Sequence, residues 1–203
     1  YIEKLSKRIS DIEIDNNINE DEKLEASSLA GKRGLYSLSS SRSTIHLDDA
    51  DSPATMGGSI NAEANPSFRE QLIKGQTEDV IDLAMDDLAD GAKILNINIA
   101  GDGIDEEKVI KDIVVQLSGT APAVISVESI SVEVLEAALR AFPGRALINI
   151  SSSAATALNK YEDIQKIAEK YGALFLTEGI SGDDVLKSAV EYNGKMLDVI
   201  LHL

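Results

Sequence analysis

The stretch "SVEVLEAALRAFPGRALINIS", residues 131–151, decides the fold. Its first half predicts a helix, because apolar residues recur at helical spacing: Val132, Leu135, Leu139 and Phe142. Pro143 and Gly144 mark the end of this helix. The apolar run "RALINIS" that follows predicts a buried strand with a carboxamide, Asn149, near its end. The stretch is therefore one helix-to-strand unit of an α/β protein.

The same alternation continues on both sides of this unit, from about residue 54 onward. Predicted strands lie at residues 92–100, 123–129, 145–151, 173–178 and 195–203. Predicted helices lie at residues 69–91 (in two pieces), 105–119, 131–144, 157–172 and 181–194, with Asp105 as the N-cap of the second. Continuous apolar strands that alternate with helices indicate a parallel sheet. We expect either an α/β barrel or an open α/β sheet.

The first 52 residues have a different composition. Residues 1–9 predict a short helix, and an acidic, Asn-rich segment and the serine-rich "SLSSSRST" follow. Such composition is typical of a solvated linker. We therefore predict an irregular acidic connector over residues 1–52 and one α/β domain over residues 53–203.

The charge and the residue types exclude several classes of function. A net charge of −16 argues against nucleic acid and anionic membranes as partners. The sequence has no apolar run long enough to span a bilayer and no signal-peptide pattern at its start. It contains no Cys, and its two histidines, His46 and His202, lie far apart, so no metal site is expected. These features predict a soluble cytoplasmic protein.

Polar residues occur at or just after the carboxyl ends of the predicted strands. They are Asn96, Asn98, Glu128, Ser129, Asn149, Ser151, Thr177 and Glu178. The carboxyl ends of parallel strands are where α/β barrels and open α/β sheets form their sites. We expect these residues to lie at one rim. The alternative is that each only ends a strand or begins a helix.

Five segments resemble one family. "GGSIN" (57–61), "ADGAKILNIN" (89–98), "ISVES" (125–129), "EAALRAFPGRALINISS" (136–152) and "AEKYGALFL" (168–176) are similar to the pterin-binding methyltransferase domain of cobalamin-dependent methionine synthases, a relative of dihydropteroate synthase. The resemblance covers residues 54–178. It implies a TIM-type (β/α)8 barrel. The sequence has room for about six βα units, so we expect the barrel to be incomplete. Either the other units are absent from this chain or a partner, such as a second copy in a homodimer, covers the open edges.

The resemblance also implies a pterin site. Asn61, Asn98 and Asn149 match asparagines of the family motifs, and Asn149 is the expected pterin ligand and catalytic residue. Glu128 stands where the family has an Asp that holds the amino-pyrimidinone edge of the pterin. Asp198 is the nearest match to an Asp later in the family pattern.

Four positions depart from the family motifs. Asn96, which we also expect to bind the pterin, replaces an Asp, Gly58 and Ser59 replace a Glu-Arg pair, and Ile150 replaces a Ser. Each loss of a ligand partner in a desolvated pocket would cost about 1 to 3 kcal/mol.

The activity implied is binding of methyltetrahydrofolate and transfer of its methyl group to a corrinoid. The cobalamin would be carried by a partner module, next to a homocysteine-binding module. Two alternatives stay open. One is a degenerate barrel that serves as a non-catalytic structural or interaction module. The other, weaker alternative is a dihydropteroate-synthase-like enzyme, which would need a diphosphate-binding loop with basic residues and later strands that we do not find in this sequence.

Overall fold

The computed structural model of the chain describes residues 37–47, 54–150, 161–179, 187–192 and 195–200. The helix expected at residues 1–9 lies outside this part of the chain, as does Ser151, one of the polar residues expected at the rim. The boundary between connector and domain, placed at residue 52, stays a prediction.

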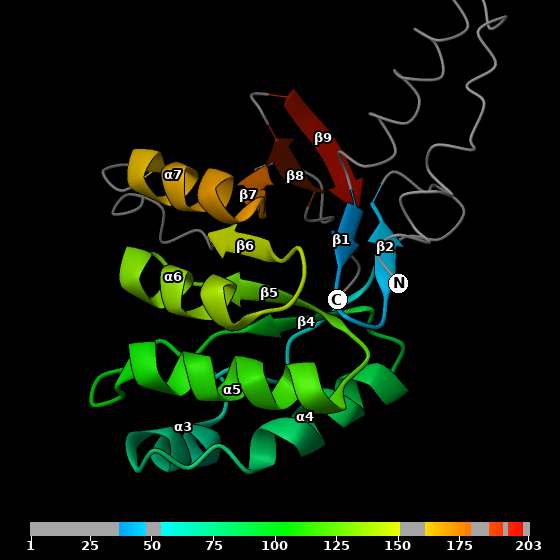
Figure 1. Cartoon of the computed structure of the whole chain (residues 1–203). Helices are drawn as coiled ribbons and strands as arrows, with labels where there is room; N and C mark the ends of the chain where they lie inside the picture. Colours follow the sequence, from blue (N-terminus) through cyan, green and yellow to red (C-terminus); the bar gives the residue numbers. More distant parts are fainter. Residues whose placement is uncertain (1–36, 48–53, 151–160, 180–186, 193–194, 201–203) are drawn as a thin grey trace, which may run out of the picture. The chain divides into compact units, whose positions relative to one another are not determined.

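The described chain is built around a seven-stranded sheet in the order β3-β4-β5-β6-β7-β8-β9 (Figure 1). Its strands are β3 (Met56–Gly57), β4 (Ile94–Ile97), β5 (Val124–Glu128), β6 (Leu147–Ile150), β7 (Leu174–Gly179), β8 (Lys187–Tyr192) and β9 (Lys195–Ile200). Strands β3 to β7 pair in parallel, whereas β7, β8 and β9 pair antiparallel. The α/β fold with a parallel sheet, predicted from the sequence, is confirmed.

Five helices accompany these strands. They are α3 (Pro66–Ile73), α4 (Asp79–Ala89), α5 (Glu106–Thr120), α6 (Val132–Ala141) and α7 (Tyr161–Tyr171). The main hydrophobic core joins their buried residues to one face of the sheet, which includes Leu95, Ile125 and Ile148. We call this the helix face. None of the described helices is long and apolar enough to cross a membrane.

Capping side chains fix where three of these helices begin. Asn65 accepts a hydrogen bond from the Phe68 N–H and precedes Pro66 at the first position of α3. Asp105 accepts from the Lys108 N–H, which confirms it as the N-cap of α5. Ser131 caps α6 in the same way. The helix starts predicted from sequence near residues 105 and 131 are therefore confirmed.

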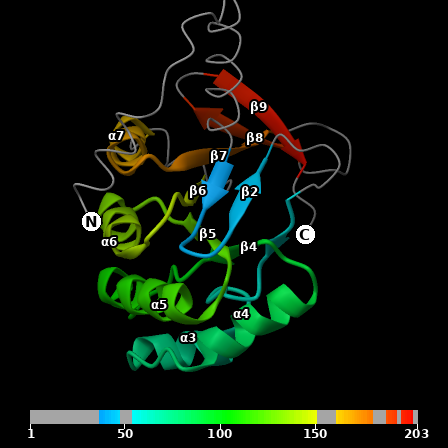
Figure 2. The same cartoon turned by 45° about the vertical axis from the view of Figure 1, so that its right-hand side comes forward.

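The opposite face of the sheet is covered at its amino end by a β-hairpin (Figure 2). Strands β1 (Ser37–Ser39) and β2 (Thr44–His46) pair antiparallel and bury Leu38 against the first residues of the parallel strands. We call this the hairpin face. The serine-rich stretch was expected to be a linker, and that expectation is wrong for residues 37–46. This serine-rich stretch contains two strands of three residues, which composition does not reveal. Their inward side chains are Leu38 and Ile45.

Backbone hydrogen bonds attach the hairpin to the sheet. The Arg145 N–H donates to the Ser39 carbonyl at 2.8 Å, and the Ser39 N–H donates to the Arg145 carbonyl at 3.1 Å. This approach requires a glycine at position 144, because a Cβ there would collide with the Ser39 carbonyl. The guanidinium of Arg42 also donates to the carbonyls of Gly119 and Thr120.

The end of the sheet differs from the sequence prediction. A helix was expected over residues 181–194, but residues 187–192 form β8. Tyr192 pairs with Lys195, so only Asn193 and Gly194 connect β8 to β9, and Asn-Gly strongly favours a two-residue hairpin connection. The last strand, β9, is consequently antiparallel to its neighbour.

These differences change the expected barrel. The structure describes five parallel strands, not six, followed by an antiparallel pair. Among the described strands, β3 and β9 each have a single neighbour, so the sheet is open there and no closed (β/α)8 barrel is seen. The parallel strands nevertheless place their carboxyl ends along one rim, where the expected site residues lie.

Candidate functional site

The hairpin face changes from apolar to polar along the parallel strands. At the amino ends, its side chains form one small core with Leu38: Ile94, Val124, Leu147 and Leu174. Because side chains alternate between faces, the next residues on this face lie two positions further along. Those residues are Asn96, Ser126 and Asn149. All three are buried, so polar groups lie inside the fold at the carboxyl half of this face.

Pairing of the strands brings four polar side chains together there. Asn96 and Asn98 come from the end of β4, Glu128 from the last position of β5, and Asn149 from β6. Glu128 lies directly opposite Asn149 in the β5–β6 register. We call Asn96, Asn98, Glu128 and Asn149 the polar cluster. All four were predicted from sequence as site residues.

The carboxylate of Glu128 is the centre of the polar cluster. It accepts hydrogen bonds from three carboxamide nitrogens: Asn96 Nδ2 at 2.7 Å, Asn98 Nδ2 at 3.2 Å and Asn149 Nδ2 at 3.4 Å. Bonds to an ionised acceptor are shorter and stronger than those between neutral groups. No Lys or Arg in the described residues forms an ion pair with Glu128. The polar cluster therefore orients a carboxylate without neutralising it.

Two buried oxygen atoms at this face have no hydrogen-bond partner among the described residues. They are Oδ1 of Asn149 and Oγ of Ser126, whose side chain is fully buried. Leaving a buried polar atom unsatisfied costs about 1–3 kcal/mol. Asn149 thus uses its amide nitrogen within the polar cluster and retains an acceptor that a ligand N–H group can satisfy.

The loop after β3 brings a second carboxylate to the polar cluster. Asn98 Nδ2 lies 3.5 Å from Oε2 of the exposed Glu63. Asn61, predicted as a ligand, accepts the N–H groups of Glu63 and Ala64 through its side-chain oxygen. Its backbone also bridges to Asn98. Asn61 therefore shapes the loop that carries Glu63, a residue that the sequence analysis missed because no strand end precedes it directly.

A buried carboxylate on α4 holds the same loop from the other side. Asp87 accepts the Ser59 hydroxyl at 2.6 Å and the Ser59 N–H at 3.1 Å. Position 57 must be glycine here, because a Cβ on it would collide with the Asp87 carboxyl group. Sequence reasoning missed Asp87, since an Asp on an acidic helix is usually exposed. The sequence signal that could have indicated this contact is Ser59, which departs from the family motif.

The structure does not bring Asp198 to the polar cluster. It describes the backbone of this residue, which lies in β9 and pairs with Ala189 of β8. Ala189 pairs with Thr177, and Thr177 with Ile150. The register thus places Asp198 in the row of Ile150, not in that of Asn149, and its role as a ligand stays a prediction.

A separate charged group links α6 to α7. Glu136 forms ion pairs at 2.7 Å with Arg140 and with Lys170, and it accepts the Tyr171 hydroxyl at 3.1 Å. These hydrogen bonds, chiefly that of Lys170, lower the pKa of Glu136 from 4.5 to about 2. The group lies on the helices, so it contributes to their packing and not to the polar cluster. The described residues contain no group of three or more His, Cys, Asp or Glu suited to a metal ion.

Comparison with known proteins identifies one family. The family model described as "Pterin binding enzyme" matches residues 57–197, which spans β3 to β9 and includes every residue of the polar cluster. No curated protein matches the chain.

Proposed function

The chain belongs to the pterin binding enzyme family, and from this premise we propose that the polar cluster binds the pterin ring of methyltetrahydrofolate. The observation that carries the proposal is Oδ1 of Asn149, which has no hydrogen-bond partner in the described part of the chain and lies beside the Glu128 carboxylate. A pterin ring offers an exocyclic amine and a ring N–H on one edge, and these two donors match a carboxylate in bidentate fashion.

Each member of the polar cluster then has a distinct task. Glu128 accepts the two donors of the pterin edge, while Asn96 and Asn98 keep its carboxylate oriented. Asn149 accepts a ring N–H through Oδ1 and holds the ring in place during the reaction. The contribution to catalysis is orientation of the methyl group and assistance to protonation at N5 of the pterin, without a covalent intermediate on the protein.

We further propose that the methyl acceptor is a corrinoid. The sequence motifs that resemble methionine synthases support this step. The cobalamin would be held by a partner module and would supply the methyl-accepting centre when it docks. The described residues of this chain would bind and orient the folate. A homocysteine-binding module would complete methionine synthesis.

One observation favours a second candidate, a non-catalytic structural module. Glu128 already accepts three hydrogen bonds from its own chain, so a ligand has to displace part of this network. Ser59 is likewise engaged with Asp87 through its hydroxyl and its backbone N–H.

Calorimetric titration of the full chain with methyltetrahydrofolate separates the two candidates. Pterin binding predicts measurable heat with a dissociation constant in the micromolar range, and a loss of affinity of about tenfold or more in Asn149→Ala, since a buried hydrogen-bond partner is removed. Gln165→Ala removes a carboxamide from the exposed surface of α7 and is the matched control. A folded, cooperatively unfolding chain that gives no heat would support the structural module.

A further inference from the structure

Arg69 on α3 differs from the other described arginines. Arg42, Arg140 and Arg145 each donate to a carbonyl or a carboxylate. Arg69 is half-buried, yet its guanidinium has no hydrogen bond or ion pair with any described residue. A partly desolvated guanidinium carries five donors in a rigid fork that matches a carboxylate, so a guanidinium without a partner among the described residues can receive an anionic ligand group.

The position of Arg69 connects it to the polar cluster. Its Nε atom lies 3.2 Å from where a Cβ of Gly101 would be, so the guanidinium rests against the backbone of that residue. Gly101 follows Asn98 by three residues, and the Ala100 N–H donates to Oδ1 of Asn98. Three residues of chain span at most about 11 Å, so Gly101 lies within about 11 Å of Asn98 in the polar cluster, and the Arg69 guanidinium lies beside Gly101.

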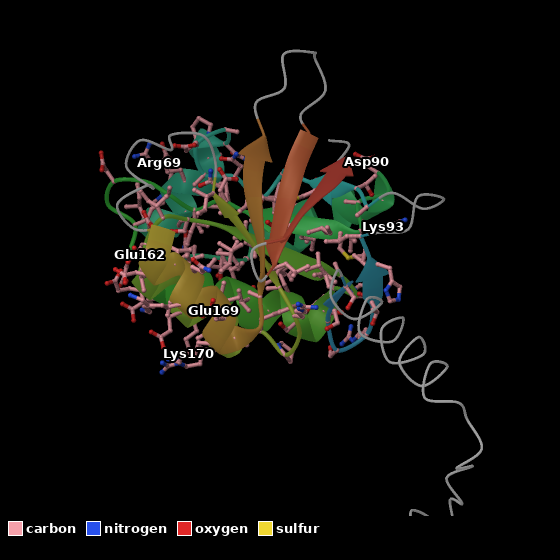
Figure 3. All side chains as sticks on the ribbon, turned by 90° about the horizontal axis from the view of Figure 1, so that it is seen from above. Arg69, Asp90, Lys93, Glu162, Glu169 and Lys170 are labelled. Atoms are coloured by element: carbon pink, nitrogen blue, oxygen red, sulfur yellow. The ribbon has the colours of Figure 1, made fainter. Side chains whose placement is uncertain are left out.

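Figure 3 places Arg69 on the appropriate side of the sheet. Arg69 lies on the same side as Glu162, in the first turn of α7, whereas Lys93, directly before β4, lies on the opposite side. Lys93 marks the amino ends of the parallel strands. Arg69 therefore lies at the carboxyl-end rim, beside the loop that follows β4.

The neighbouring backbone cannot take the place of this side chain. The Gly101 N–H already donates to Oε1 of Glu106 at 3.1 Å. Glu106 and Glu63 make this rim acidic, so an anion would be repelled unless a cation receives it directly. Among the donors described at this loop, the guanidinium of Arg69 is the one suited to an anion.

We propose that Arg69 binds the carboxylate tail of the folate, so that the site selects a pterin that carries a glutamate over a bare pterin. This inference rests on the proposed function, because it requires the pterin ring at the polar cluster. Glu128 and the amides receive the neutral ring, and Arg69 forms an ion pair with a tail carboxylate across the loop between Asn98 and Gly101. Glycine at position 101 leaves room for the Arg69 guanidinium, because any side chain there would press on it.

The test compares two ligands against matched variants of the full chain. Methyltetrahydrofolate and the tail-less 6-methyltetrahydropterin are titrated calorimetrically into the wild type, Arg69→Gln and Lys74→Gln. Lys74, exposed at the end of α3, changes the net charge equally and is the control. We expect Arg69→Gln to weaken folate binding about tenfold, the loss of one charged pair, and to leave 6-methyltetrahydropterin unchanged. Arg69→Lys should keep part of the preference for the folate.

The outcomes separate this inference from the proposed function. Equal affinity of the wild type for both ligands, or an equal loss for both in Arg69→Gln, would overturn the role of Arg69 while the pterin site stands. If Lys74→Gln reduces the preference for the folate as much as Arg69→Gln does, the preference depends on the net charge of the protein. That result would also overturn the role of Arg69. If neither ligand binds the folded wild type, the proposed function fails and this inference fails with it.

Discussion

The two halves of the hairpin face are formed by the same strands but differ in their side chains: the amino half is an apolar core, and the carboxyl half is the polar candidate site. At the amino half, Leu147 is 1% exposed and packs against Leu38 of the hairpin. Two residues further along β6, Asn149 is 7% exposed and keeps an acceptor without a partner among the described residues. The cluster around Leu38 consists of apolar side chains, whereas the carboxyl half buries an oxygen atom that no described residue satisfies. Burial alone therefore does not distinguish core from site, but satisfaction of the buried groups does.

The largest expected effect is a loss of stability when a core side chain of the amino half is truncated. Leu147→Ala removes a buried side chain and leaves a cavity, so the free energy of unfolding should fall by about 2–5 kcal/mol. Urea denaturation measures this change. Val115→Ala, at a 55% exposed position of α5, should change stability by less than about 0.5 kcal/mol and is the control.

Ligand binding by the same variant tests whether the amino half contributes to the affinity for the ligand. Folded Leu147→Ala should retain the affinity of the wild type for methyltetrahydrofolate, because Leu147 packs in the hydrophobic core at the amino half of this face. A large loss of affinity in Leu147→Ala, measured under conditions in which the variant is shown to be folded, would contradict the division into two halves.

The next effect concerns the carboxyl half. Glu128→Gln removes the charge of the polar cluster and replaces one acceptor oxygen by a donor facing other donors. Two charged hydrogen bonds to the pterin would be lost, so affinity should fall about a hundredfold. Glu70→Gln, an exposed glutamate of α3, should bind as the wild type does. If Glu128→Gln binds methyltetrahydrofolate as tightly as the wild type does, the Glu128 carboxylate does not bind the pterin.

The smallest expected effect lies outside both halves, at Glu136. Because the pKa of Glu136 is lowered to about 2 in the folded state, its ionised form stabilises the fold above about pH 4.5, and this contribution is lost as the pH falls towards 2. The difference in thermal midpoint between the wild type and Glu136→Gln should therefore shrink over that window. Glu169→Gln serves as the control, and a difference that does not depend on pH would contradict this assignment.

The sequence predicted the parallel strands because their apolar runs are long and continuous. β4, β5 and β6 and the helices between them were recognised in this way, and the polar residues at their ends do meet in one cluster. The hairpin β1–β2 was missed because strands of three residues in a serine-rich stretch give almost no periodic signal. β8 was placed within a predicted helix over residues 181–194, since a strand of six residues gives only a short alternating pattern.

Residues that act from the loops and helices were harder to predict. Glu63 reaches the polar cluster only through the turn that Asn61 shapes, and Asp87 becomes buried only because Ser59 and Gly57 fit around it. Arg69 is distinguished from other arginines by the absence of a described partner, which no sequence pattern encodes. These features depend on tertiary contacts and not on local spacing.

The most direct test of the central claim follows the side-chain amides of the polar cluster by nuclear magnetic resonance. Methyltetrahydrofolate is added to the ¹⁵N-labelled chain, and the NH₂ signals of Asn96, Asn98 and Asn149 are compared with that of Gln165 on α7. We expect the three asparagine signals to shift at saturating ligand, and that of Gln165 to stay unchanged. Unchanged asparagine signals in the presence of bound ligand would contradict the central claim, because the pterin would then lie elsewhere.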